Sequence, residues 1–117
     1  MMEISKRFRF EAAHRLEDLP PQHPCANLHG HSYQLIVYVK GNPDNRGFVM
    51  DYRDLSEVVK RRVIDYVDHC YLNDNHIHQP TAENLCYWAW VRLASEINGL
   101  SAVEIKETES TSCVYRP

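Results

Sequence analysis

Residues 25–39 read Cys25-Ala-Asn-Leu-His29-Gly-His31-Ser-Tyr33-Gln-Leu-Ile-Val-Tyr-Val39. In an extended chain successive side chains point to opposite faces, so His29 and His31 project to the same side. The apolar side chains at positions 33, 35, 37 and 39 continue that face. This alternation predicts a strand from about His31 to Lys40, with two imidazoles at the head of its apolar stripe.

A third imidazole ends a similar stripe upstream, in residues 3–13. The apolar residues there share one parity, interrupted only by Lys6, and His14 is next in phase; they are Ile4, Phe8, Phe10 and Ala12. If the two segments pair as antiparallel neighbours, His14, His29 and His31 converge at one end of the sheet. Three nitrogen ligands leave tetrahedral zinc one open position, as in catalytic zinc sites. We therefore predict a zinc site; the alternative is a hydrogen-bonded core histidine beside a local turn.

The whole chain has the size and composition of one globular domain, residues 1–117. Its formal charge of −3 gives no general attraction to nucleic acid or to anionic membranes. No apolar run reaches transmembrane length, and the N-terminus lacks the hydrophobic centre of a signal peptide, so we expect a cytoplasmic protein. The four cysteines show no CxxC pairing and are interpreted as separate thiols.

Two helices are predicted in the second half of the chain. Asp51 is a suitable N-cap for a helix whose apolar residues recur at helical spacing over 54–67. Thr81 is a suitable cap for a second helix that runs to about Asn98, where Gly99 ends it.

Two further strands complete the pattern, over 103–108 and 111–116. The order strand, strand, helix, helix, strand, strand predicts an α+β fold, with a four-stranded antiparallel sheet and two helices on one face. Such a sheet has two exposed edges, and these favour homo-oligomerisation.

Cys25 precedes the histidine pair and has two possible roles. Its sulfur could be the fourth zinc ligand and close a structural site, or it could stand beside the metal as a thiolate base. A nearby cationic charge favours the thiolate form. We favour the base, because closure by Cys25 would leave no position for a substrate.

Asp68 and His69 follow the first predicted helix. A carboxylate that accepts one imidazole N–H fixes the tautomer and leaves the other nitrogen for proton transfer. Adjacent residues rarely bond through their side chains, so this relay requires a bend in the loop. The alternative is an ordinary helix-end histidine, which the helix dipole would favour.

Glu107 shares the parity of the apolar residues Val103 and Ile105. A carboxylate on an apolar face is costly unless it is paired. Two parallel N–H groups, such as the amino-pyrimidinone edge of a pterin or guanine, would satisfy both oxygens; alternatively, the strand has ended and Glu107 lies in solvent. His76 and His78 repeat the His-x-His spacing in a polar run, and we expect a solvated loop there.

The combined motifs resemble the 6-pyruvoyl-tetrahydropterin synthase family, and within it the bacterial 6-carboxytetrahydropterin synthases of queuosine biosynthesis. The likeness covers nearly the whole chain and rests on Phe10-Glu-Ala-Ala-His14, Cys25-x3-His29-Gly-His31-Ser-Tyr33, Val67-Asp-His69, Leu72-Asn-Asp74, Pro80-Thr-Ala-Glu-Asn84 and Val103-x-Ile-Lys-Glu107-Thr108. The three-residue gap between the cysteine and His-Gly-His favours the carboxy branch, because the animal pyruvoyl enzymes typically have a longer gap.

The resemblance implies a role for each candidate residue. It makes His14, His29 and His31 the zinc ligands, Cys25 the catalytic base, Asp68 and His69 the partner relay, and Glu107 the pterin anchor. It implies the tunnelling fold (T-fold), in which three subunits join their sheets into a barrel and two barrels stack into a homohexamer with active sites at subunit boundaries.

The implied substrate is 7,8-dihydroneopterin triphosphate, with release of triphosphate and, in the carboxy enzymes, of acetaldehyde. Two other readings stay open: a pyruvoyl enzyme that stops after triphosphate elimination, and a non-catalytic zinc-stabilised interaction module.

Overall fold

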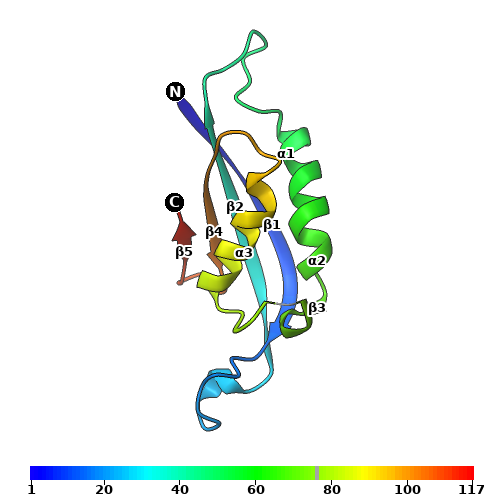
Figure 1. The fold of residues 1–117 in the computed structure, drawn as a ribbon, viewed down its shortest axis with the longest axis vertical. Helices are drawn as coiled ribbons and strands as arrows, with labels where there is room; N and C mark the ends of the chain where they lie inside the picture. The colour runs from blue at the N-terminus through cyan, green and yellow to red at the C-terminus, as the bar shows by residue number, and fades with distance from the viewer. Residues whose placement is uncertain (76) are drawn as a thin grey trace.

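The computed structural model describes residues 1–75 and 77–117 (Figure 1). A long sheet lies against a layer of helices, and the chain is elongated, with principal extents of 56 × 23 × 22 Å. In chain order the elements are β1 (Met2–His14), the 3-10 turn η1 (Pro24–Ala26), β2 (His29–Gly41), α1 (Tyr52–Val59), the π-helical turn η2 (Lys60–Ile64), α2 (Asp65–Val67), β3 (Cys70–Tyr71), the 3-10 turn η3 (Leu72–Asn75), α3 (Ala82–Ala94), β4 (Leu100–Lys106) and β5 (Cys113–Tyr115).

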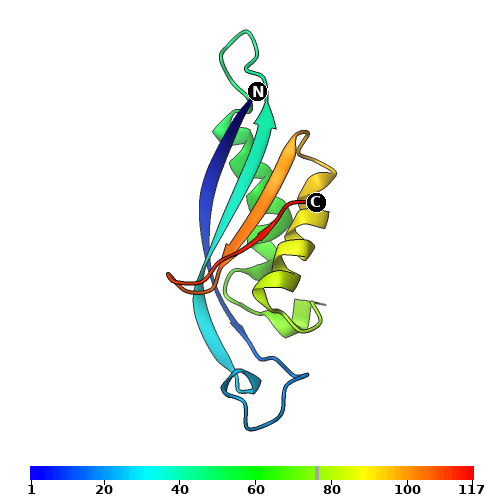
Figure 2. The same cartoon turned by 90° about the vertical axis from the view of Figure 1, so that its left-hand side faces the viewer.

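The sheet has five strands in the order β3-β1-β2-β4-β5, and the helices cover one of its faces (Figure 2). The α+β class and the helix layer are confirmed, but the prediction of four purely antiparallel strands is wrong, because β3 pairs with β1 in parallel. The helical segment over 52–67 runs in the same direction as β1, so the residues that follow it pair with the free edge of β1 in parallel. With two residues, β3 is too short to show an alternation in the sequence.

The pairing of β1 with β2 brings the two apolar stripes side by side. The strands are antiparallel, with Phe10 opposite Tyr33, Ala12 opposite His31 and His14 opposite His29. Tyr33, Leu35 and Val37 are completely buried. The rings of Phe10 and Tyr33 stack with their centroids 4.7 Å apart, and this pair lies next to the histidines in the folded sheet. A rigid, buried pair of strands therefore supports the imidazoles.

The first predicted helix begins where expected, because the Asp51 side chain accepts the N–H of Arg53. The predicted helix over 54–67 is confirmed in extent, because α1, η2 and α2 follow one another without a break; only its regularity differs, since η2 is a π-helical turn. Tyr66, near the end of this helix, is half-exposed, and its ring centroid lies 4.1 Å from the guanidinium carbon of Arg92. Within the described residues, no helix is long and apolar enough to cross a membrane.

The second predicted helix is α3, capped by Thr81, whose hydroxyl accepts the N–H of Asn84. It ends at Ala94, earlier than the predicted Asn98. Ile97 nevertheless stays buried, because the N–H of Glu96 and of Ile97 both bond to the carbonyl of Leu93.

Gly99 marks the turn into β4. Its φ is +87°, a conformation that favours glycine, and a Cβ at this position would overlap the carbonyl oxygen of Lys40. The Gly99 carbonyl accepts the Lys40 N–H at 2.8 Å, which joins this turn to β2.

Candidate metal centre and active site

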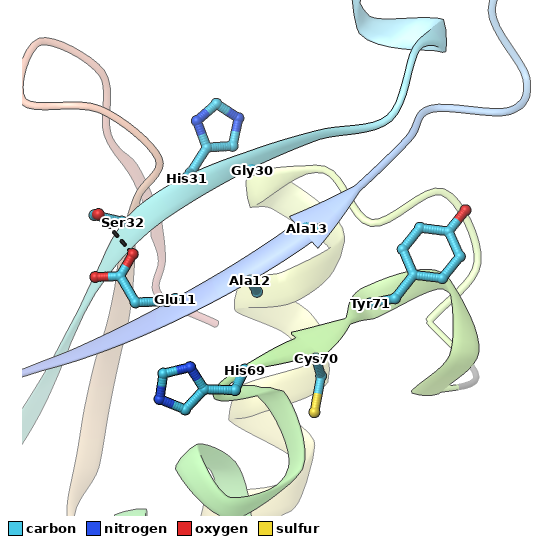
Figure 3. Close-up of a pocket in the computed structure, with 9 residues that line it drawn as sticks. All are labelled: Glu11, Ala12, Ala13, Gly30, His31, Ser32, His69, Cys70 and Tyr71. Carbon is cyan, nitrogen blue, oxygen red and sulfur yellow. Dashed lines mark hydrogen bonds between the residues drawn. The ribbon is translucent and has the colours of Figure 1, made fainter.

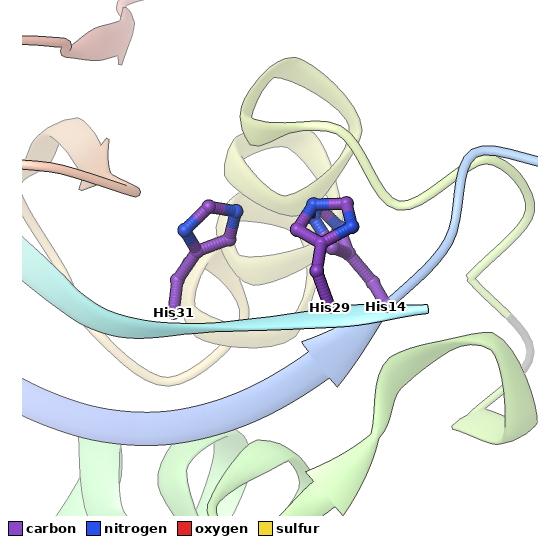
Figure 4. A group of neighbouring side chains, drawn as sticks. All are labelled: His14, His29 and His31. Atoms are coloured by element: carbon purple, nitrogen blue, oxygen red, sulfur yellow. Dashed lines mark hydrogen bonds between the residues drawn. The ribbon is translucent and has the colours of Figure 1, made fainter. Parts of the chain in front are cut away.

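His14, His29 and His31 converge at the paired ends of β1 and β2 (Figure 4). Their ring centroids are 4.5, 5.1 and 5.0 Å apart. Each offers one nitrogen, and these nitrogens all lie within 4.8 Å of one another. His14 is buried, while the other two are half-buried. The predicted convergence of three imidazoles is confirmed.

Backbone carbonyls fix the tautomers of two of these rings. His14 donates its Nδ1–H to the carbonyl of Pro80, and His29 donates its Nδ1–H to the carbonyl of Asn27, both at 2.7 Å. When both rings are neutral, each Nε2 therefore carries a lone pair, and the two Nε2 atoms are 2.9 Å apart. Two acceptors this close repel each other unless a cation lies between them. This arrangement fits a metal ion.

The third nitrogen points to the same conclusion. The Nε2 of His31 is buried and has no hydrogen-bond partner. An unpaired buried polar atom is costly, and coordination to a metal would satisfy it. Burial lowers the pKa of His14 below its ordinary value of 6.5, and this favours the neutral form that binds metals. The hydrogen bonds to Pro80 and Asn27 are the outer contacts typical of metal-binding histidines.

Cys25 lies in η1, between the long loop and β2, and is half-buried. Among the described residues, the one group able to hold a metal is the histidine triad, and Cys25 is outside it. Within this chain the thiol is therefore not one of the clustered groups that could hold the metal.

Glu107 follows directly after the end of β4 and faces the triad. Its Oε2 is 3.8 Å from the Nε2 of His31, and its side chain is 26% exposed. The strand has ended, as the alternative interpretation held, but the carboxylate is not in open solvent. At 3.8 Å the contact is too long for a hydrogen bond, so both oxygens can accept bonds from a ligand. Glu107 also lines a pocket of about 240 Å³, together with Ala82, Glu83, Ile105, Thr111, Ser112 and Cys113.

Asp68 and His69 lie at the β3 edge of the sheet, where α2 ends. His69 has a φ of +59°, uncommon for a non-glycine residue, and its N–H donates to the carbonyl of Glu11 at 2.6 Å. The Oδ1 of Asp68 accepts the N–H of Glu11 at 3.0 Å. This bend brings the Nε2 of His69 to 3.6 Å from the Oδ2 of Asp68, so the side chains of adjacent residues do approach each other.

The structure does not bring this pair to the triad within one chain. The His69 side chain is 79% exposed and projects from the open β3 edge. Figure 3 shows His31 and His69 with strand β1 between them, at a shallow pocket of about 520 Å³.

The second His-x-His sequence has a different environment. His78 is exposed and bonds to the Oδ2 of Asp18 at 2.8 Å, as expected for a solvated loop; His76 lies outside the described residues. Sequence reasoning missed the carbonyls of Pro80 and Asn27, because a backbone acceptor leaves no signature in residue type.

The family model described as 6-pyruvoyl tetrahydropterin synthase matches residues 3–117. The chain belongs to the 6-pyruvoyl tetrahydropterin synthase family. The structure of the Caenorhabditis elegans 6-pyruvoyl tetrahydropterin synthase superposes with a TM-score of 0.89 at 28% identity, covering 99% of this chain and 95% of that one. The predicted T-fold of this family is therefore confirmed.

Relatives within the 6-pyruvoyl tetrahydropterin synthase family carry two enzyme names. The 6-carboxy-5,6,7,8-tetrahydropterin synthase of Synechocystis is 37% identical, covering 98% of this chain and 93% of that protein. The enzyme of the same name from Haemophilus influenzae is 29% identical, with 99% of both chains covered. The 6-pyruvoyl tetrahydrobiopterin synthase of Dictyostelium discoideum is 33% identical, covering 97% of this chain and 94% of that protein.

Proposed function

We propose that this single-domain chain is a zinc-dependent 6-carboxy-5,6,7,8-tetrahydropterin synthase. It converts 7,8-dihydroneopterin triphosphate to 6-carboxytetrahydropterin and releases acetaldehyde and triphosphate. The observation that carries the proposal is the histidine triad with its facing lone pairs, in a member of this family. Full-length similarity to two relatives named for this activity supports the carboxy branch.

Zinc is the metal we assign to His14, His29 and His31. Three neutral imidazoles and an open fourth position are the donor set of catalytic zinc sites. When bound there, zinc would supply Lewis-acid chemistry to the hydroxyl groups of the substrate side chain.

Glu107 would hold the pterin ring. Its two carboxylate oxygens can accept a forked pair of N–H bonds from the amino-pyrimidinone edge. Because Glu107 lies 3.8 Å from His31, a ring bound by this carboxylate has its side chain next to the metal-binding nitrogens. Glu107 thus orients the substrate.

Cys25 and the Asp68–His69 pair would move the protons. Cys25, as a thiolate, takes a proton from the substrate side chain, and His69 exchanges a second proton while Asp68 stabilises its cationic form. The exposure of His69 fits a group that serves a neighbouring subunit, because in its own chain strand β1 lies between it and His31.

We propose a homohexamer, built as a dimer of trimers, as the working form. Strands β3 and β5 are the sheet edges, with two and three residues respectively, and each leaves backbone groups available for pairing with another chain. Joining these edges would bring His69 of one subunit to the triad and Cys25 of the next. The active site would then be complete only in the assembly.

The deciding experiment incubates the zinc-loaded protein with 7,8-dihydroneopterin triphosphate and identifies the products by mass spectrometry. We expect acetaldehyde and 6-carboxytetrahydropterin. A pyruvoyl pterin without acetaldehyde would establish the second candidate, a 6-pyruvoyl-tetrahydropterin synthase, which the Dictyostelium relative favours. Glu107→Gln, which keeps the side-chain shape but replaces an acceptor by a donor, should raise KM for this substrate.

Two variants test the thiol and the shared site. Cys25→Ala should stay folded and zinc-loaded but lose activity; loss of zinc and of the fold together would favour the zinc-stabilised interaction module. Co-expressed Cys25→Ala and His69→Ala chains should recover part of the activity that each lacks alone, because mixed assemblies contain sites with both wild-type residues. No recovery in a confirmed mixed oligomer would place both residues in one subunit's site.

A further inference from the structure

The N-terminal turn of α3 contains a side chain with no role in the chemistry above. Asn84 donates its Nδ2–H groups to the carbonyl of Gln79 at 2.8 Å and, more weakly, to that of His78 at 3.3 Å. Both carbonyls belong to the segment that leads directly to Pro80, whose own carbonyl accepts the Nδ1–H of His14. Asn84 is therefore connected to the histidine triad through one short turn.

That turn has a conformation that needs support. Gln79 has a φ of +49°, a left-handed conformation that is unfavourable for a non-glycine residue and persists only where its surroundings hold it. Its carbonyl accepts two hydrogen bonds, from Asn84 and from the N–H of Thr81 at 2.7 Å. The amide of Asn84 thus stabilises the strained residue directly before the buried Pro80.

A second contact closes this turn against the chain that follows His14. The Oε1 of Gln79 accepts the N–H of Asp18 at 3.2 Å. The result is a ring of contacts, from His14 along the chain to Asp18, across to Gln79, and through Pro80 back to His14. Hydrogen bonds from Asp18 and Asn84 thus hold Gln79, the residue directly before Pro80. The position of the Pro80 carbonyl in turn determines the orientation of the His14 ring.

We infer that Asn84 is a positioning residue for the metal centre, acting through Gln79 and Pro80 on His14. Without its amide donors, the Gln79 turn relaxes and the Pro80 carbonyl no longer fixes the His14 Nδ1–H. The His14 Nε2 then loses its preset direction toward the other two nitrogens. This inference rests on the metal site of the proposed function.

The discriminating variant is Asn84→Asp. It is nearly isosteric; it replaces the N–H donors by an acceptor oxygen and adds a negative charge, which the helix dipole favours in the first turn of α3. Its helix should therefore be at least as stable as that of the wild type. Asn45→Asp is the matched control, because it makes the same change of charge at an exposed position in the loop between β2 and α1, and that loop lies far from the start of α3 (Figure 1).

The measurements are the zinc affinity, by competition with a chromophoric chelator, and the melting temperature of the metal-free protein. Outer contacts of metal ligands typically contribute 10- to 100-fold in affinity, and since Asn84 acts one step further out we expect a loss of roughly 3- to 10-fold. Asn84→Asp should show this loss with only a small drop in the melting temperature of the metal-free protein, and Asn45→Asp should match the wild type in both.

Three results would overturn the inference or its basis in different ways. An Asn84→Asp protein that binds zinc as tightly as the wild type refutes the positioning role. A loss of zinc affinity together with a large drop in the metal-free melting temperature makes Asn84 merely structural. If the wild type itself binds no zinc, the metal site of the proposed function fails, and the inference fails with it.

Discussion

The substitution His31→Leu tests the metal centre, because its effect on the stability of the protein should change sign when zinc is added. Leucine roughly preserves the volume of the side chain and continues the apolar stripe beside Tyr33, but it removes the nitrogen that is buried without a partner. An unsatisfied buried polar atom costs about 1–3 kcal/mol. In the metal-free state the variant should therefore be as stable as the wild type or more stable, by up to about 1 kcal/mol after some loss of packing.

With zinc the order should reverse. A metal that binds only the folded state, at 100 times its dissociation constant, stabilises the wild type by about 2.7 kcal/mol, or roughly 10 °C in melting temperature. The variant keeps two of the three nitrogens and should gain less than about 1 kcal/mol at the same zinc concentration.

The assay is urea or thermal denaturation at pH 7.5, with chelator and with zinc. His78→Leu is the matched control, because it makes the same replacement at an exposed imidazole outside the triad. A metal-free His31→Leu protein that is more than about 2 kcal/mol less stable than the wild type, or one that zinc stabilises equally, would refute the reasoning about the unpaired nitrogen.

Three further outcomes are expected. Burial lowers the pKa of His14 below 6.5 in the folded state, so the contribution of this residue to stability is present above the unfolded-state pKa and is lost as the pH falls below about 6.5. The free energy of unfolding of the metal-free protein, measured at pH 7.5, 6.5 and 5.5, should therefore decrease as the pH falls. An increase would contradict this prediction. Leu35→Ala, at a completely buried position, should cost about 2–5 kcal/mol in urea denaturation, and a cost below about 1 kcal/mol would show that the site is not in the core. Gly99→Ala should cost at least about 1 kcal/mol, because of its positive φ and the overlap with the Lys40 carbonyl, whereas Gly47→Ala, with an equally positive φ but open space, should cost less.

The sequence by itself determined which residues face the core of the central strands. Strand periodicity is strict, so the alternation around Phe10 and Tyr33 placed His14, His29 and His31 on one face and in phase. The same argument placed Glu107 toward this face. Local chemistry was equally direct at the helix starts, where Asp51 and Thr81 satisfy N–H groups only a few residues away.

Only the tertiary structure decided the features that depend on contacts between distant segments. The parallel edge strand β3 is two residues long and exists through its pairing with β1, so no local pattern announces it. The bend at His69 is held by the backbone of Glu11, and the orientation of His14 is held by the carbonyl of Pro80. Backbone groups are nearly the same in every residue, and their hydrogen-bond partners follow from the folded arrangement of the chain. Residue types could therefore predict the metal ligands but not the backbone carbonyls that orient them.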